Sequence, residues 1–126
     1  MKKVWIVDDD EEMIRAVQLM LKLLKFETRH FLGPRPAAQA ILAGEVPDLL
    51  ILDINMPEVS GLDMLEFLRR RRETLNLPVV MLSTEAADVQ VDRALAMGAD
   101  AYVTKPVSIE ELETAMQKAF KARAKG

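Results

Sequence analysis

One segment of the sequence combines a buried-strand pattern with side chains that could do chemistry. Residues 48–57 read Asp-Leu-Leu-Ile-Leu-Asp-Ile-Asn-Met-Pro and follow directly on Pro47. The apolar run 49–52 is too short for a helix, so we predict a strand over 48–52 that is covered on both faces and followed by Asp53. Ligands of open parallel sheets bind at the carboxyl ends of the strands. A carboxylate there could be a metal ligand, a nucleophile or only the first residue of a solvated loop.

The rest of the chain repeats a strand–helix pattern around this segment. Apolar runs predict further strands over 4–7, 26–32, 78–82 and 101–103, and helical spacing predicts helices over 11–24, 37–43, 60–72, 86–97 and 108–122. We expect Gly33-Pro34-Arg35-Pro36 to break the chain before the second helix. Regular alternation is typical of an α/β fold, a parallel sheet with helices on both faces. Right-handed crossovers then bring the carboxyl ends of all five strands to one edge.

Several reactive side chains follow these predicted strands directly. Each alone has an ordinary explanation, since acids cap helices, hydroxyls occur in loops and most lysines lie on the surface. Their occurrence at four strand ends of one sheet favours a common site. The residues are Asp8 and Asp9 after the first strand, Asp53 after the third, Ser83 and Thr84 after the fourth, and Lys105 after the fifth.

The donor types in this set point to a divalent cation. Three neighbouring carboxylates repel one another, so they either take up protons or bind a cation. The chain has no cysteine and its single histidine, His30, lies away from the set, so all-oxygen ligands favour Mg²⁺ or Mn²⁺ over zinc. An aspartate beside Mg²⁺ can be a nucleophile that forms an aspartyl phosphate. Lys105 and the Ser83 hydroxyl would then supply charge and a hydrogen bond to the phosphoryl oxygens.

Composition limits the class of protein. A chain of 126 residues, half of them hydrophobic, predicts one domain over 1–126. The net charge of −3 gives no bulk electrostatic case for binding nucleic acid or an anionic membrane. No apolar stretch approaches the ~20 residues of a membrane span, so we expect a cytoplasmic protein. The run Arg69–Arg72 is interpreted as a solvated helix end in preference to a nucleic-acid site, because cations complement the dipole there.

The sequence resembles the receiver domain of response regulators, the CheY-like phosphoacceptor of two-component signal transduction. The resemblance covers nearly the whole chain in order and spacing. It implies a flavodoxin-like (βα)5 sandwich with a five-stranded parallel sheet of order 2-1-3-4-5. The matching motifs are Val7-Asp8-Asp9, Leu52-Asp53-Ile54-Asn55-Met56-Pro57 with Gly61, Pro78-Val79-Val80-Met81-Leu82-Ser83, Gly98-Ala99 and Tyr102-Val103-Thr104-Lys105-Pro106.

The resemblance also implies a role for each site residue. Asp53 would be phosphorylated by the phosphohistidine of a histidine kinase or by a small phosphodonor. Mg²⁺ would be bound by Asp9, Asp53 and the Asn55 carbonyl, with Asp8 acting through water or positioning the site. Lys105, beside a cis bond to Pro106, would pair with the phosphoryl group, which Ser83, Thr84 and Asn55 would also contact. Ser83 and Tyr102 would form the switch, although a core aromatic is an equal interpretation of Tyr102.

These assignments predict a switch and not an enzyme, although one that assists its own phosphorylation and dephosphorylation. Its expected partners are a sensor histidine kinase or phosphotransfer protein and an unidentified downstream protein. Helix 86–97, strand 101–103 and helix 108–122 would form the output face or a homodimer contact.

Three alternatives remain open: a receiver cut from a longer DNA-binding or enzymatic regulator, a docking domain that needs no phosphorylation, and an Asp-dependent Mg²⁺ phosphohydrolase. The last is disfavoured because Asn55 stands where such enzymes place a second aspartate.

Overall fold

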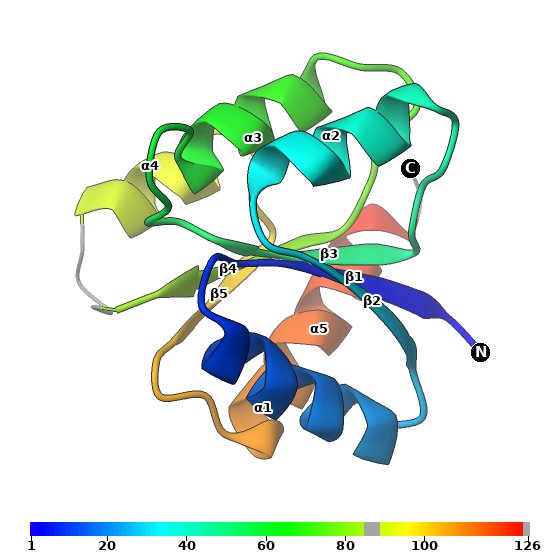
Figure 1. Cartoon of the computed structure of the whole chain (residues 1–126), viewed down its shortest axis with the longest axis vertical. Helices are drawn as coiled ribbons and strands as arrows, with labels where there is room; N and C mark the ends of the chain where they lie inside the picture. Colours follow the sequence, from blue (N-terminus) through cyan, green and yellow to red (C-terminus); the bar gives the residue numbers. More distant parts are fainter. Residues whose placement is uncertain (85–88, 125–126) are drawn as a thin grey trace.

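A parallel sheet with its strands in the order β2-β1-β3-β4-β5 forms the middle of the molecule. The structure, a computed structural model, describes residues 1–84 and 89–124. Strands and helices alternate along the chain (Figure 1), which confirms the predicted flavodoxin-like topology. The elements are β1 (Lys3–Val7), α1 (Glu11–Leu23), β2 (Glu27–Phe31), α2 (Pro34–Leu42), β3 (Leu49–Asp53), α3 (Gly61–Arg69), β4 (Val79–Ser83), α4 (Val89–Ala96), β5 (Ala101–Thr104) and α5 (Ile109–Arg123).

The central strands are buried on both faces, as their uninterrupted apolar runs predict. Every residue of β3 and of β4 is buried, whereas the edge strand β2 buries only Phe31. In the register of the sheet, Val7 of β1 pairs with Leu52 of β3, and Asp53 pairs with Leu82 of β4. The residues that follow β1, β3 and β4 therefore emerge side by side at the carboxyl edge.

Helices cover both faces of the sheet. Figure 1 shows α2, α3 and α4 on one face and α1 and α5 on the other. Alternate residues of each central strand point to opposite sides, so Leu50 and Leu52 pack in the core under α2 to α4, and Ile51 packs with α1 and α5. None of the helices in the described residues is long and apolar enough to cross a membrane.

Side-chain caps fix where three of the helices begin. Asp10 accepts hydrogen bonds from the N–H groups of Glu12 and Met13, at 3.0 and 3.3 Å, so α1 begins directly after the acidic residues that follow β1. Ser60 forms a capping box with Asp63 at the start of α3. Ser108 caps the start of α5, since its hydroxyl accepts from the Glu111 N–H at 3.2 Å.

The predicted chain break before α2 is wrong. The helix already begins at Pro34, because proline is tolerated in the first helical turn, where its missing N–H would have no helical partner. For α4, the structure gives Val89–Ala96 where 86–97 was predicted, and residues 86–88 lie outside the described part. Gly98, two residues after the last residue of α4, adopts φ +110°, the left-handed conformation that commonly follows a helix.

The prediction of a solvated arginine run is also wrong at its first residue. The carboxylate of Asp100 lies 3.3 Å from Arg69 Nη2 and 2.8 Å from Arg123 Nε, and it also accepts from the Val79 N–H at 2.9 Å. Both arginines donate to the carbonyl of Gly98, at 3.0 and 2.8 Å. We call Arg69, Asp100 and Arg123 the amino-edge cluster. It joins the ends of α3 and α5.

Candidate functional site

Three carboxylates meet at the carboxyl edge of the sheet. Asp8 and Asp9 follow β1, and Asp53 is the last residue of β3. One oxygen of each lies within 4.8 Å of the other two. Asp8 and Asp53 are buried whereas Asp9 is exposed, so the group opens to solvent on one side. The structure thus brings together the three acids that the sequence placed at neighbouring strand ends.

Lys105 lies over two of these acids. Its Nζ is 3.3 Å from Asp53 Oδ1 and 3.4 Å from Asp8 Oδ2. The Lys105 N–H donates to the carbonyl of Ser83 at 2.7 Å, and the bond to Pro106 is cis, as the resemblance implies. The contact with Asp8 was not part of the prediction, which paired Lys105 only with a phosphoryl group.

Burial dominates the electrostatics of the site. Loss of solvent, and then the charge of Asp8, raise the pKa of Asp53 to about 6, although Lys105 and the backbone N–H of Asn55 oppose the shift. Burial also raises the pKa of Asp8. For Lys105, burial alone would lower the pKa, but the charges of Asp53 and Asp8 outweigh it and the net shift is upward. The three carboxylates therefore carry more negative charge than one lysine compensates.

One oxygen of Asp8 shows that the residues fit a cation. Asp8 Oδ1 accepts from the Asp10 N–H at 3.0 Å. Asp8 Oδ2 is fully buried and accepts no well-formed hydrogen bond from residues 1–84 and 89–124, although the Lys105 ammonium lies 3.4 Å from it. A buried carboxylate oxygen without a donor costs free energy that a bound cation would recover. Carboxylates without imidazole or thiolate suit a hard divalent ion such as Mg²⁺.

The remaining predicted residues surround the acids at different depths. Ser83 is buried at the end of β4, where it pairs in register with Thr104, and Thr84 is exposed beyond it. Asn55 is exposed, while its main-chain N–H hydrogen-bonds to the Asp53 carboxylate. Tyr102 points outward from β5 with 38 % of its surface exposed, so it is not a core aromatic in this structure.

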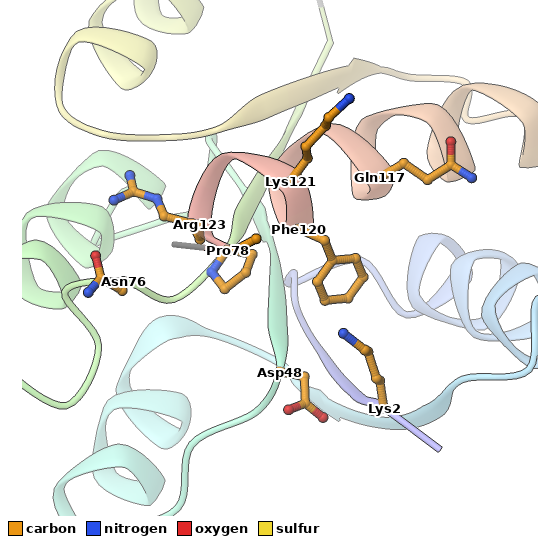
Figure 2. Close-up of a pocket in the computed structure, with 9 residues that line it drawn as sticks. Lys2, Asp48, Asn76, Pro78, Gln117, Phe120, Lys121 and Arg123 are labelled. Atoms are coloured by element: carbon orange, nitrogen blue, oxygen red, sulfur yellow. The ribbon is translucent and has the colours of Figure 1, made fainter. Parts of the chain in front are cut away.

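A surface pocket of about 640 Å³ lies at the opposite end of the molecule and contains none of these residues. Figure 2 shows Lys2 and Phe120 facing each other in it, beside Pro78, with Asp48 below. The Lys2 ammonium is 4.4 Å from the centre of the Phe120 ring, and Asp48 accepts from the Lys3 N–H at 2.7 Å. Lys2 and Asp48 thus both have partners within the protein.

The fold and the site together place the chain in a class of proteins. It is an α/β protein with helices on both faces of a parallel sheet, and three acids and a lysine form an acidic cation site at the carboxyl ends of the strands. Residues 4–117 match the family described as Response regulator receiver domain. The chain belongs to that family, whose members are signalling switches and not enzymes.

Individual relatives agree in sequence and in fold. The chain is 40 % identical over 123 residues to the phosphate regulon transcriptional regulatory protein PhoB of Rhizobium meliloti, covering 98 % of this chain and 53 % of the regulator. It is 32 % identical to the chemotaxis protein CheY-3 of Vibrio cholerae, covering 94 % of this chain and 91 % of that protein. A CheY-like receiver domain protein from Methanospirillum hungatei superposes with a TM-score of 0.85 at 26 % identity, covering 100 % and 99 % of the two chains.

The relatives differ in length. The chain spans about half or less of the first curated relatives it matches, 53 % of the Rhizobium regulator and 17 % of the protein RcaC from Microchaete diplosiphon. It spans nearly all of the chemotaxis protein. Similarity therefore extends to the receiver part of longer proteins and to a receiver that makes up almost a whole protein.

One residue beside the site was named only as part of a motif. Gly61, the first residue of α3, lies directly against the main chain of Asp53. The sequence contained the signal, a glycine eight positions after Asp53, but not the reason for it, because such a contact depends on where the helix docks.

Proposed function

We propose that this chain is a phosphorelay receiver that accepts a phosphoryl group on Asp53 and changes its surface in response. The observation that carries the proposal is the Asp53 carboxylate itself. It ends a fully buried strand, lies 3.3 Å from the Lys105 ammonium, and shares a cluster with Asp8 and Asp9. A nucleophile, a cationic partner and a cation site thus occur within one edge of the sheet.

The proposed reaction transfers phosphorus from nitrogen to oxygen. An ionised Asp53 oxygen attacks the phosphorus of a phosphohistidine on a sensor kinase or phosphotransfer protein, or of a small phosphodonor. A phosphorus–oxygen bond forms, the phosphorus–nitrogen bond breaks, and the histidine nitrogen leaves with its electron pair and takes up a proton. Asp8, Asp9, Asp53 and the Asn55 carbonyl would hold Mg²⁺ or Mn²⁺, whose positive charge would offset the negative charge of the transferred oxygens.

Neighbouring side chains stabilise the product. The Lys105 ammonium, released from Asp53 once that oxygen is esterified, pairs with a phosphoryl oxygen. The Ser83 hydroxyl and the main-chain N–H of Thr84 donate to the others, with Asn55 beside them. Because β4 carries Ser83 and adjoins β5, movement of Ser83 toward the phosphoryl group would let Tyr102 turn inward.

The proposed output is a change on the face formed by α4, β5 and α5, which then binds a downstream protein or a second copy of the chain. We propose no direct contact with nucleic acid by this domain and a cytoplasmic location. Since several relatives are longer transcriptional regulators, the receiver could equally serve an output domain joined to it. In either case we treat 1–126 as a single receiver unit.

The first test is intact-mass measurement after incubation with acetyl phosphate, with and without Mg²⁺. We expect one phosphoryl adduct that requires Mg²⁺, and its loss in Asp53→Asn, because the amide is not a nucleophile at this position. Asp92→Asn, which changes an exposed acid on α4 outside the cluster, is the matched control and should retain the adduct.

An adduct that persists in Asp53→Asn would contradict the proposal, as would the absence of any adduct from acetyl phosphate and from a phosphorylated histidine kinase. Partner binding that is unchanged by Asp53→Ala would favour a docking domain instead.

A further inference from the structure

Gly61 approaches the phosphoacceptor more closely than any side chain would allow. A Cβ at position 61 would overlap the carbonyl oxygen of Asp53 and would lie 2.8 Å from the Cα of Ile54. Both are main-chain atoms, which cannot move aside as the end of a flexible side chain can. Gly61 does not have a positive φ, so space and not backbone conformation is what excludes a larger residue.

The start of α3 is held firmly in this position. The Gly61 N–H donates to the carbonyl of Ile54 at 2.8 Å. Ser60 and Asp63 close the capping box, with the Ser60 N–H 3.2 Å from Asp63 Oδ2 and the Asp63 N–H 3.3 Å from Ser60 Oγ. Leu65, a residue of α3 itself, is fully buried against the core. A shift of the helix alone therefore cannot relieve the clash that an added methyl group would cause. The main chain at Asp53 and Ile54 would have to move.

That main chain carries the proposed metal and phosphoryl contacts. Asn55 follows Ile54 and donates its N–H to the Asp53 carboxylate, while its carbonyl is a proposed metal ligand. The loop between the strand and the helix is tightly bent, since Glu58 adopts φ +68° without being glycine. The loop has little freedom to compensate for a shift at either of its ends.

We propose that Gly61 is a positioning residue for phosphoryl acceptance. Because it has no side chain, α3 packs close enough to fix the main chain of residues 53–55 where the three acids and the Asn55 carbonyl converge. This inference rests on the proposed function. It assigns Gly61 no contact with the phosphoryl group and no chemical step.

The test compares Gly61→Ala with Gly33→Ala. Gly33 also begins a helix, yet a Cβ there would meet nothing within 4 Å, and its φ of 179° suits any residue. We expect Gly61→Ala to fold, to bind Mg²⁺ about tenfold more weakly by calorimetry without phosphodonor, and to take up phosphoryl groups at least tenfold more slowly at saturating Mg²⁺. Gly33→Ala should stay within twofold of wild type in both measurements.

Mg²⁺ affinity and uptake within twofold of wild type in Gly61→Ala would overturn the inference. If that variant does not fold, Ser60→Ala, which loosens the same helix start without a clash, should weaken Mg²⁺ binding severalfold in the folded protein, and an unchanged affinity there would overturn it. A wild-type chain that forms no adduct would instead overturn the proposed function, and the inference with it.

Discussion

Asp53 holds a charge in a place that disfavours it. The side chain is almost fully buried beside a second buried acid, and its pKa is raised to about 6, first by burial and then by Asp8. Lys105 reduces this cost without removing it. Perturbed carboxyl groups of this kind are concentrated at functional sites, so the environment of Asp53 supports the proposal that it accepts a cation and a phosphoryl group.

The raised pKa makes a prediction about stability. A carboxyl whose folded pKa lies above its unfolded value of 3.8 favours folding below about pH 4, and this contribution is lost as the pH rises through about 6. We expect Asp53→Asn to raise the free energy of unfolding without Mg²⁺ by about 1–3 kcal/mol at pH 7.5 and by much less at pH 4.5. Urea denaturation at the two pH values measures the difference.

Glu113→Gln, which changes an exposed acid on α5, controls for the loss of one negative charge and should change stability little at either pH. Equal stabilisation by Asp53→Asn at both pH values would contradict the strained-carboxylate explanation and point to repacking by the amide.

At the scale of single elements, α3 links the two edges of the sheet. Its first residue lies against Asp53 and its last, Arg69, belongs to the amino-edge cluster. There Asp100, with only 5 % of its side chain exposed, is shared by two guanidinium groups that also donate to the carbonyl of Gly98. Burial, and then the charge of Arg123, lower the pKa of Arg69 to about 10, although the charge of Asp100 opposes the shift.

We expect Arg123→Ala to cost about 1–3 kcal/mol of unfolding free energy, because a buried carboxylate loses one of its two cationic partners. Arg70→Ala is the matched control. Its ion pair with Glu66 has side chains 76 % and 53 % exposed, so removing it should cost about 0.5 kcal/mol or less. Thermal unfolding of both variants measures the difference, and equal effects would show that the cluster does not anchor α5.

The elements themselves could be predicted from sequence because their signals are local. Uninterrupted apolar runs mark β3 and β4, and Ser60 and Ser108 mark helix starts. The helix at Pro34 was placed three residues late, because proline was interpreted as a break where its geometry also suits a first turn. The amino-edge cluster left no local signal, since Arg69 and Arg123 meet only after α3 and α5 have docked.

At the scale of the whole molecule, the topology explains why the site could be predicted better than its contacts. Parallel strands in the observed order place Asp8, Asp53 and Lys105 at one edge whatever the details of packing. The distances between side chains at this edge depend on how the helices and loops pack there, which the pattern of the strands does not predict. The ion pair between Lys105 and Asp8, and the contact of Gly61 with the acceptor, therefore appeared only in the structure.

The topology also suggests how a change at Asp53 reaches the output face. Lys105 follows directly on β5, and its N–H donates to the carbonyl of Ser83 at 2.7 Å. Because its ammonium also contacts Asp53, this one residue connects Asp53, the end of β4 and the strand that carries Tyr102. Tyr102 is now partly exposed. Phosphorylation that redirects the Lys105 ammonium should therefore alter β5 and the adjoining surface of α5.

We expect phosphorylation of the wild-type chain to change amide hydrogen exchange severalfold in β5 and α5, measured by mass spectrometry. Lys105→Ala should still accept a phosphoryl group, because the nucleophile and the acids remain, yet leave exchange in β5 close to that of the unphosphorylated protein. Lys22→Ala, an exposed lysine in the last turn of α1, should respond as wild type does. A full exchange response in phosphorylated Lys105→Ala would show that the signal reaches β5 without this ammonium, and would leave Ser83 as the residue that carries it.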